Sequence, residues 1–319
     1  MIGAAGEVDT TSGPWQVSLF YRNLHSERRF VGSQESPDPH VAVNDIHVID
    51  LAISYALTKR YGLDLDILIV HMNREQSVRA GQTFGGRFDT QAAGLGDVSI
   101  VGRRWLFDPA TNRRRNVSLG LGIKMPTGKD VATDVFQTFG GPVVQTVDQS
   151  IQPGDGGWGI KLEASTFQTF GRSFTLFSTL DYLSNPRGTN GVRTYRPRAS
   201  EAVMSVPDQY LGRLGLQFPV WSSNGLWGTL AWRIEGVPAR DLLGPSTGFR
   251  RPGYAVSVEP GLRVTRSSST AFVSVPFAVY RNRVKSVPDE TDAPIPTTLG
   301  NGDAAFADHL LLLGISRTF

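Results

Sequence analysis

The chain has no cysteine. Structural disulfides and thiolate metal sites are therefore excluded, because both need cysteine sulfur. It also has no run approaching the ~20 consecutive apolar residues that a membrane-spanning helix requires, although 40% of its 319 residues are hydrophobic. The mean hydropathy of −0.16 is typical of a soluble protein. A membrane β-barrel gives the same average, because only alternate residues of its strands face lipid.

The chain also lacks a large excess of positive or negative residues. The net charge is only +3, so no nucleic-acid partner is expected, and the basic run at 113–116 is interpreted as a solvated turn. Residues 1–13 have neither the basic start nor the sustained apolar stretch of an export signal. We expect them to form a short periplasmic segment, with the signal peptide absent from this sequence.

What the chain does have is alternation. Twelve segments place apolar side chains on every second position, each about as long as the ~9–11 residues that a tilted strand needs to cross a bilayer. No segment of similar length has a convincing helical period. The predicted strands are 14–24, 46–57, 63–73, 95–106, 115–126, 158–169, 173–184, 208–218, 226–237, 253–265, 271–283 and 306–319.

The connections between these segments alternate in length. Six long ones (25–45, 74–94, 127–157, 185–207, 238–252 and 284–305) alternate with five short ones (58–62, 107–114, 170–172, 219–225 and 266–270). Outer-membrane barrels have short periplasmic turns, long outer loops and an even strand number. The sequence thus predicts an all-β, transmembrane, antiparallel up-and-down β-barrel of about twelve strands over residues 1–319. Asp64 and Asp66 are interpreted as flanking one of the solvated turns.

The last strand has Leu311, Leu313 and Ile315 on one face and ends on Phe319. We expect this face to contact lipid and the strand to pair with the first one, because an open edge in lipid leaves backbone groups unsatisfied. A terminal Phe resembles the signal read by bacterial barrel-assembly machinery. Aromatic residues near strand ends predict interfacial girdles; the expected members are Trp15, Tyr55, Trp158, Tyr182, Tyr210, Trp232, Tyr254 and Phe319.

Charged residues on the opposite face must point into a lumen, because Arg or Lys facing lipid at mid-depth costs ~2–4 kcal/mol. Two roles remain open for them: salt bridges that fill and stiffen the barrel, or a polar lining that selects solutes. Both signs occur, so strong ion selectivity is not expected. The expected lumen-lining residues are Asp97, Lys124, Lys161, Glu163, Asp181, Arg213, Arg233, Glu235, Glu259 and Arg263.

Five glycine-rich segments carry a family resemblance. They are GLGD (94–97), GLGIKMPTGKD (120–130), QPGDGGWG (152–159), RRPGY (250–254) and VPFAVYRNR (275–283). Their order and spacing over residues 94–319 resemble the outer-membrane transporter family associated with the meta-cleavage pathway of phenol degradation. The resemblance implies a bacterial outer-membrane barrel that takes up small aromatic or hydrophobic compounds, and it supplies no binding-residue pattern.

Three motifs suggest other chemistry. The tract at 122–130 has five residues between its glycines and Asp130 after the lysine, so it does not fit a phosphate-binding loop. The sequence GPSTG (244–248) lies in a loop without the strand and helix of a nucleophile elbow. None of the five histidines stands two residues from a serine in a way that would place both on one face of a strand, and His25 and His40 lie in an expected loop. No catalytic residue, metal ligand or cofactor is therefore expected.

We expect a monomeric outer-membrane channel that takes up small organic solutes passively through a narrow lumen, partly closed by loops such as 127–157. Its expected partners are outer-membrane lipid and lipopolysaccharide, the solute, and barrel-assembly machinery through Phe319. Two alternatives stay open: a barrel-embedded lipid hydrolase, which needs a Ser–His contact on the outer wall, and a plugged structural or interaction barrel without transport.

Overall fold

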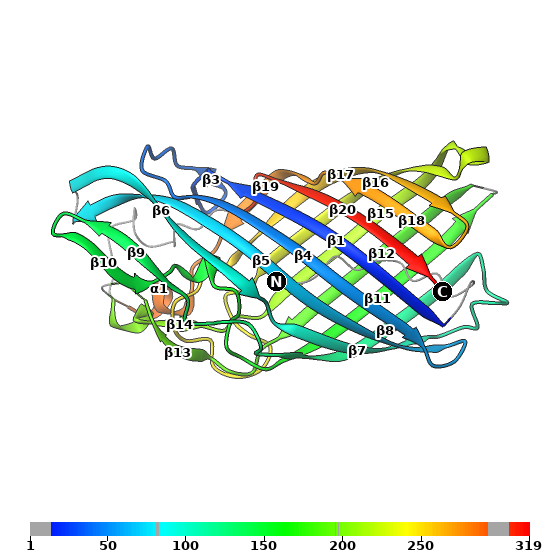
Figure 1. Cartoon of the computed structure of the whole chain (residues 1–319), viewed down its shortest axis with the longest axis horizontal. Helices are drawn as coiled ribbons and strands as arrows, with labels where there is room; N and C mark the ends of the chain where they lie inside the picture. Colours follow the sequence, from blue (N-terminus) through cyan, green and yellow to red (C-terminus); the bar gives the residue numbers. More distant parts are fainter. Residues whose placement is uncertain (1–13, 81–82, 172, 195, 197, 293–305) are drawn as a thin grey trace.

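The chain folds into a closed antiparallel barrel, described here from a computed structural model (Figure 1). The structure describes residues 14–80, 83–171, 173–194, 196, 198–292 and 306–319; the predicted segment 1–13 lies outside them. The wall strands are β1 (Trp15–Ser26), β4 (Val43–Ala56), β5 (Tyr61–Ala80), β6 (Thr83–Leu95), β7 (Val98–Trp105), β8 (Arg115–Met125), β11 (Gly159–Phe170), β12 (Phe174–Ser184), β15 (Gln209–Trp221), β16 (Leu226–Val237), β17 (Gly253–Arg266), β18 (Ser269–Ser274), β19 (Phe277–Arg283) and β20 (His309–Thr318).

These fourteen strands fill twelve wall positions, since β6 and β7 share one position and β18 and β19 share another. The seam is closed by β1 and β20, which pair from Gln16↔Thr318 to His25↔His309. The predicted twelve-stranded barrel and its terminal seam are thereby confirmed. Every wall strand except β6, which pairs with β5 alone, has a partner on both sides, so the cylinder closes on itself as a barrel in lipid must.

Apolar side chains cover the outside of the wall. Leu121 on β8 is 63% exposed and Ile315 on β20 is 56% exposed, whereas Lys124 is only 4% exposed. In a membrane barrel the exposed side of such a strand contacts hydrocarbon, and the polar side faces the lumen. The alternation in the sequence therefore correctly predicted which side chains of these strands face outward and which face the lumen.

The long connections contain structure of their own at one end of the barrel, at the left in Figure 1. In their described parts they hold two hairpins and a third small strand pair, two 3₁₀ turns and one short helix: β2 (Phe30–Val31), β3 (Gln34–Glu35), β9 (Thr133–Thr138), β10 (Gly141–Thr146), β13 (Thr189–Arg193), β14 (Val203–Ser205), η1 (Gln149–Ile151), η2 (Ala199–Glu201) and α1 (Val287–Thr291). A further 3₁₀ turn, η3 (Ser222–Asn224), lies in a short turn at the other end. In the described part of the chain, no helix has the length and apolarity needed to span a membrane.

Two predicted strands differ from the structure. The expected loop 74–94 is mostly strand, because β5 continues to Ala80 and β6 returns from Thr83. This extension is polar on both faces, so it lacks the alternation that marks the lipid-facing part. The predicted strand 271–283 is interrupted between β18 and β19 at Val275–Pro276, where proline lacks the N–H that a ladder needs.

Candidate functional site

The lumen contains two cavities. One, of ≈ 310 Å³, lies toward the long loops, and the other, of ≈ 210 Å³, lies toward the short turns. Asp66 and Lys161 line both cavities. These two side chains therefore stand where the cavities meet, and they form the partition between them.

The partition is a hydrogen-bonded group of charges. Lys161 Nζ on β11 lies 3.2 Å from Asp66 Oδ2 on β5 and 3.2 Å from Glu163 Oε1. It also donates to Ser99 Oγ on β7 at 3.1 Å, and Ser99 in turn donates to Asp66 at 3.0 Å. Because one cation has two carboxylates and a hydroxyl around it, its charge is compensated where water is scarce.

A second charged group centres on Glu259 of β17, which is 1% exposed. Arg213 donates to both of its oxygens, at 3.1 and 2.5 Å, and Ser274 donates to Oε1 at 3.1 Å. Arg233 lies 3.7 Å from the same carboxylate and 2.7 Å from Glu235. This network joins neighbouring strands β15, β16, β17 and β18, so it stiffens one side of the wall.

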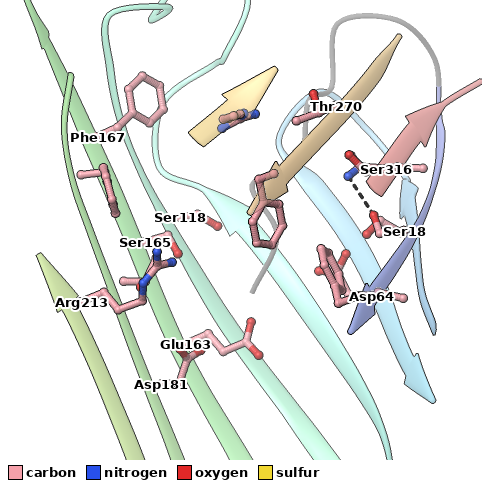
Figure 2. A pocket seen from close by; sticks show the side chains of 18 of the residues that line it. Ser18, Asp64, Ser118, Glu163, Ser165, Phe167, Asp181, Arg213, Thr270 and Ser316 are labelled. Carbon is pink, nitrogen blue, oxygen red and sulfur yellow. Dashed lines mark hydrogen bonds between the residues drawn. The ribbon is translucent and has the colours of Figure 1, made fainter. Parts of the chain in front are cut away.

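The smaller cavity combines aromatic and acidic walls (Figure 2). Phe20 and Phe272 have ring centroids 6.0 Å apart, and Trp105 meets Phe167 edge to face at 6.3 Å. Figure 2 shows the side chains of Glu163 and Asp181 close together, with Asp64 on another part of the wall. The cavity thus offers flat apolar surfaces together with hydrogen-bond acceptors.

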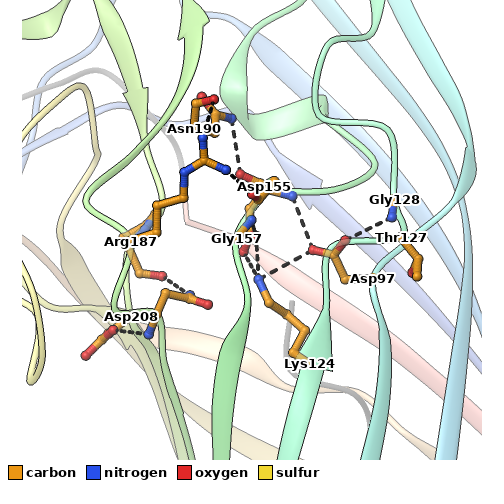
Figure 3. A network of polar contacts seen from close by, with 12 residues as sticks. Asp97, Lys124, Thr127, Gly128, Asp155, Gly157, Arg187, Asn190 and Asp208 are labelled. Carbon is orange, nitrogen blue, oxygen red and sulfur yellow. Dashed lines mark hydrogen bonds and ion pairs between the residues drawn. The ribbon is translucent and has the colours of Figure 1, made fainter.

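Three of the glycine-rich segments meet beside the larger cavity (Figure 3). Asp97 accepts hydrogen bonds from the backbone N–H groups of Gly128, at 3.0 Å, and Asp155, at 3.2 Å. Lys124 pairs with the carboxylates of both Asp97 and Asp155. A Cβ on Gly128 would lie 2.7 Å from Gly154 Cα, so this contact requires glycine.

The segment that follows Met125 turns into the barrel and narrows it. Its residues Val147 and Ile151 are fully buried and pack in one cluster with Val70 and Met72, which point inward from β5. Asp148 is 1% exposed and binds both terminal nitrogens of Arg251 at 2.6 Å. As expected for residues 127–157, this loop closes part of the lumen.

The structure brings most of the predicted lumen-lining residues to the cavities. Asp97, Lys124 and Lys161 line the larger one, and Lys161, Glu163, Asp181, Arg213 and Arg263 line the smaller one. Arg233, Glu235 and Glu259 line neither cavity and belong to the buried network behind Arg213.

The interpretation of Asp64 and Asp66 as residues that flank a solvated turn missed their place in the lumen. Both lie in β5, inside the predicted strand 63–73, and point into the smaller cavity, where Asp64 binds Arg103 at 3.0 Å. The strand begins at Tyr61, two residues earlier than predicted. The alternation of these aspartates with Leu63 and Leu65 was the signal that could have placed them inside.

The predicted girdle residues lie at three heights. Trp15, Tyr55 and Phe319 stand at the short-turn end, where the rings of Trp15 and Tyr55 are 4.4 Å apart. Trp158, Tyr182, Tyr210 and Tyr254 stand at the long-loop end, near the ends of β11, β12, β15 and β17. Trp232 lies in the middle of β16, opposite Leu214 and Val258, and is 58% exposed.

The histidines show no hydrolase site on the outer wall. His25, placed in a loop by the sequence pattern, is the penultimate residue of β1 and bonds Asp45 at 2.8 Å. His40 Nδ1 lies 3.3 Å from Ser77 Oγ on the extension of β5. No carboxylate orients the His40 ring among the described residues, and these residues contain no cluster of His, Asp and Glu spaced to hold a metal ion.

No protein-family model matches the sequence, and no curated protein matches it. Solved structures do match. The COG4313 outer membrane channel from Pseudomonas putida F1 is similar with a TM-score of 0.62 and 12% identity, over 98% of this chain and 100% of that one.

Two further barrels match less well. The translocator domain of the autotransporter NalP from Neisseria meningitidis has a TM-score of 0.48 and 11% identity, over 98% of this chain and 90% of that one. The P. putida toluene transporter TodX has a TM-score of 0.43 and 10% identity, over 96% and 90%. At such identities the likeness concerns the fold alone. The fold is that of the bacterial outer-membrane β-barrels.

Proposed function

We propose that this barrel is an outer-membrane channel for the passive uptake of small organic solutes. The observation that carries the proposal is the pair of cavities that meet at Lys161 and Asp66. A solute that moves those two side chains aside has a continuous path from the larger cavity to the smaller one. The likeness in fold to an outer membrane channel supports this reading.

The walls favour an apolar or aromatic solute. The smaller cavity measures ≈ 210 Å³ and carries Phe20, Phe167 and Phe272 on its surface. An engineered cavity of about 150 Å³ holds benzene, so a single aromatic ring fits in this space. The resemblance of the glycine-rich segments to the transporter family linked with meta-cleavage of phenol favours the same solute class.

The concentration gradient drives the movement, since the sequence contains no energy-coupling motif. The closed β1–β20 seam within one chain supports a monomer and a single barrel domain over residues 1–319. The partners that this proposal requires are outer-membrane lipid with lipopolysaccharide and, during assembly, machinery that reads Phe319.

The test is the current through the refolded protein in planar bilayers, together with uptake of a monoaromatic probe by vesicles that contain it. Discrete openings and faster uptake than in protein-free vesicles are expected. Absence of both would support the plugged barrel instead, a reading favoured by the packing of Ile151 inside the lumen.

The hydrolase alternative has a separate readout. Ester hydrolysis by the refolded protein that disappears in Ser77→Ala would show that the contact between His40 and Ser77 is catalytic. We expect no hydrolysis, because the His40 ring lacks the orienting group that activated serines use.

A further inference from the structure

Four strands carry an outward-facing arginine at the short-turn end of the barrel. Arg104 and Arg317 are the second-last residues of β7 and β20, Arg115 is the first residue of β8, and Arg266 is the last residue of β17. All four are exposed. They point outward, like apolar neighbours such as Leu119, and lie near the ends of their strands at two places on the wall, one on β7 and β8 and the other on β17 and β20.

Two of the four guanidinium groups lie over aromatic rings at the same end of the barrel. Arg104 lies over the Tyr61 ring at 5.5 Å, and Arg317 lies over the Phe319 ring at 5.3 Å. Arg266 and Arg317 are both cross-strand neighbours of Ser269, which places their Cα atoms about 10 Å apart across β18. Two cations are thus presented side by side at the membrane border.

These arginines lack carboxylate neighbours. Among the described residues, no Asp or Glu lies within ion-pair distance of any of the four. In the described parts of the short turns, Lys59, Arg60, Arg113 and Arg114 add positive charge and only Asp108 is acidic. At the long-loop end, by contrast, arginines such as Arg250 are buried against carboxylates. The exposed cations at the short-turn end therefore stand among few acidic residues.

We propose that this arginine rim, formed by Arg104, Arg115, Arg266 and Arg317, binds the phosphate groups of anionic phospholipids in the periplasmic leaflet. Guanidinium groups pair with phosphate through two parallel hydrogen bonds, and an interfacial cation attracts anionic lipid. The rings of Tyr61 and Phe319 hold the guanidinium groups of Arg104 and Arg317 at this border. A free anion in solution lacks this fit, since the arginines are spread along the wall rather than gathered in a pocket.

The experiment compares lipid retention. The protein is refolded in vesicles of mixed phosphatidylglycerol and phosphatidylcholine, extracted in mild detergent, and its bound lipid is measured by mass spectrometry. The anionic lipid is expected to be enriched about fivefold over the neutral one, the ratio equivalent to about 1 kcal/mol per interfacial arginine. Changing all four residues, Arg104→Gln, Arg115→Gln, Arg266→Gln and Arg317→Gln, is expected to abolish the enrichment.

A matched variant removes four exposed cations from the other end of the barrel: Lys129→Gln, Arg193→Gln, Arg240→Gln and Lys285→Gln. It is expected to keep the enrichment. Equal retention of both lipids by the wild type, or equal loss in both variants, would overturn the proposal. If the fourfold rim variant fails to fold, the pair Arg266→Gln and Arg317→Gln gives the same test. Conductance is unaffected by these changes, so failure here is separate from failure of the channel proposal.

Discussion

Lys161 Nζ lies 3.2 Å from Asp66 Oδ2 although their strands, β11 and β5, are separated in the wall by β7 and β8. The contact therefore passes over two intervening strands on the inner face of the wall, and Ser99 of β7 hydrogen-bonds to both of its ends. It divides the interior at the point where the two cavities meet. The passage that we propose depends on whether this contact opens.

Removing the partition should widen the path. In Lys161→Met with Asp66→Asn the net charge is unchanged, and Glu163, which loses the cation 3.2 Å away, is 24% exposed at its side chain and keeps contact with water. We expect a larger single-channel conductance than in the wild type, measured in planar bilayers. Lys129→Met, on an exposed loop position, is the control and should leave conductance unchanged. Unaltered conductance in the double variant would mean that another constriction limits the current.

The buried carboxylate of Glu259 should make its partner important for stability. Arg213→Met removes two hydrogen bonds from a group that is 1% exposed, and breaking a buried pair costs about 3–5 kcal/mol. Arg233 at 3.7 Å remains, so we expect the lower part of this range. The readout is the midpoint of heat-modifiable migration on detergent gels.

A matched variant separates charge from packing at the same place. Arg213→Met with Glu259→Gln should recover part of the loss, because the unpaired charge is gone. A double variant as unstable as the sum of its single variants would show that the two side chains do not interact energetically.

Close backbone contact should make Gly128 intolerant of a side chain. The added Cβ of Gly128→Ala would lie 2.7 Å from Gly154 Cα and 3.0 Å from Gly96 C, and these backbone atoms cannot rotate away. We expect destabilisation of about 1–3 kcal/mol, as in other overpacked sites, and a noisier channel as the loop shifts. Gly140→Ala, whose Cβ would meet nothing closer than 3.7 Å, should behave like the wild type.

The loop inside the barrel should act as a restriction. Ile151→Ala leaves a hole beside Val70 and Met72, and such truncations cost about 2–5 kcal/mol. The substitution weakens the packing of the loop inside the lumen but leaves the strand pairing of the wall intact. We therefore expect the channel to open more often, while the barrel still migrates as a folded protein on gels. Val144→Ala in β10, at a 67% exposed position, is the comparison and should leave gating unchanged.

Particular residues show which parts of the fold could be predicted from the sequence. The alternation of Leu119, Leu121 and Ile123 with polar neighbours is enough to orient β8, because a lipid-facing strand must bury one parity and expose the other. The same rule placed Asp64 and Asp66 in a strand, but their closeness to the turn 58–62 led to the interpretation that they face solvent, whereas they line the smaller cavity. It also missed the strand extension to Ala80, where polar residues such as Arg74 and Gln76 interrupt the apolar alternation.

The sequence alone determined the wall: strand number, the inside and outside of the strands, and the side on which the short turns lie, because a two-residue period and loop lengths are local properties of the chain. Only the tertiary structure decided the interior. Lys161 and Asp66 are 95 residues apart and meet because the sheet closes into a cylinder. Likewise, Ile151 packs on Met72 because a long loop folds back into that cylinder, and no local pattern encodes either contact.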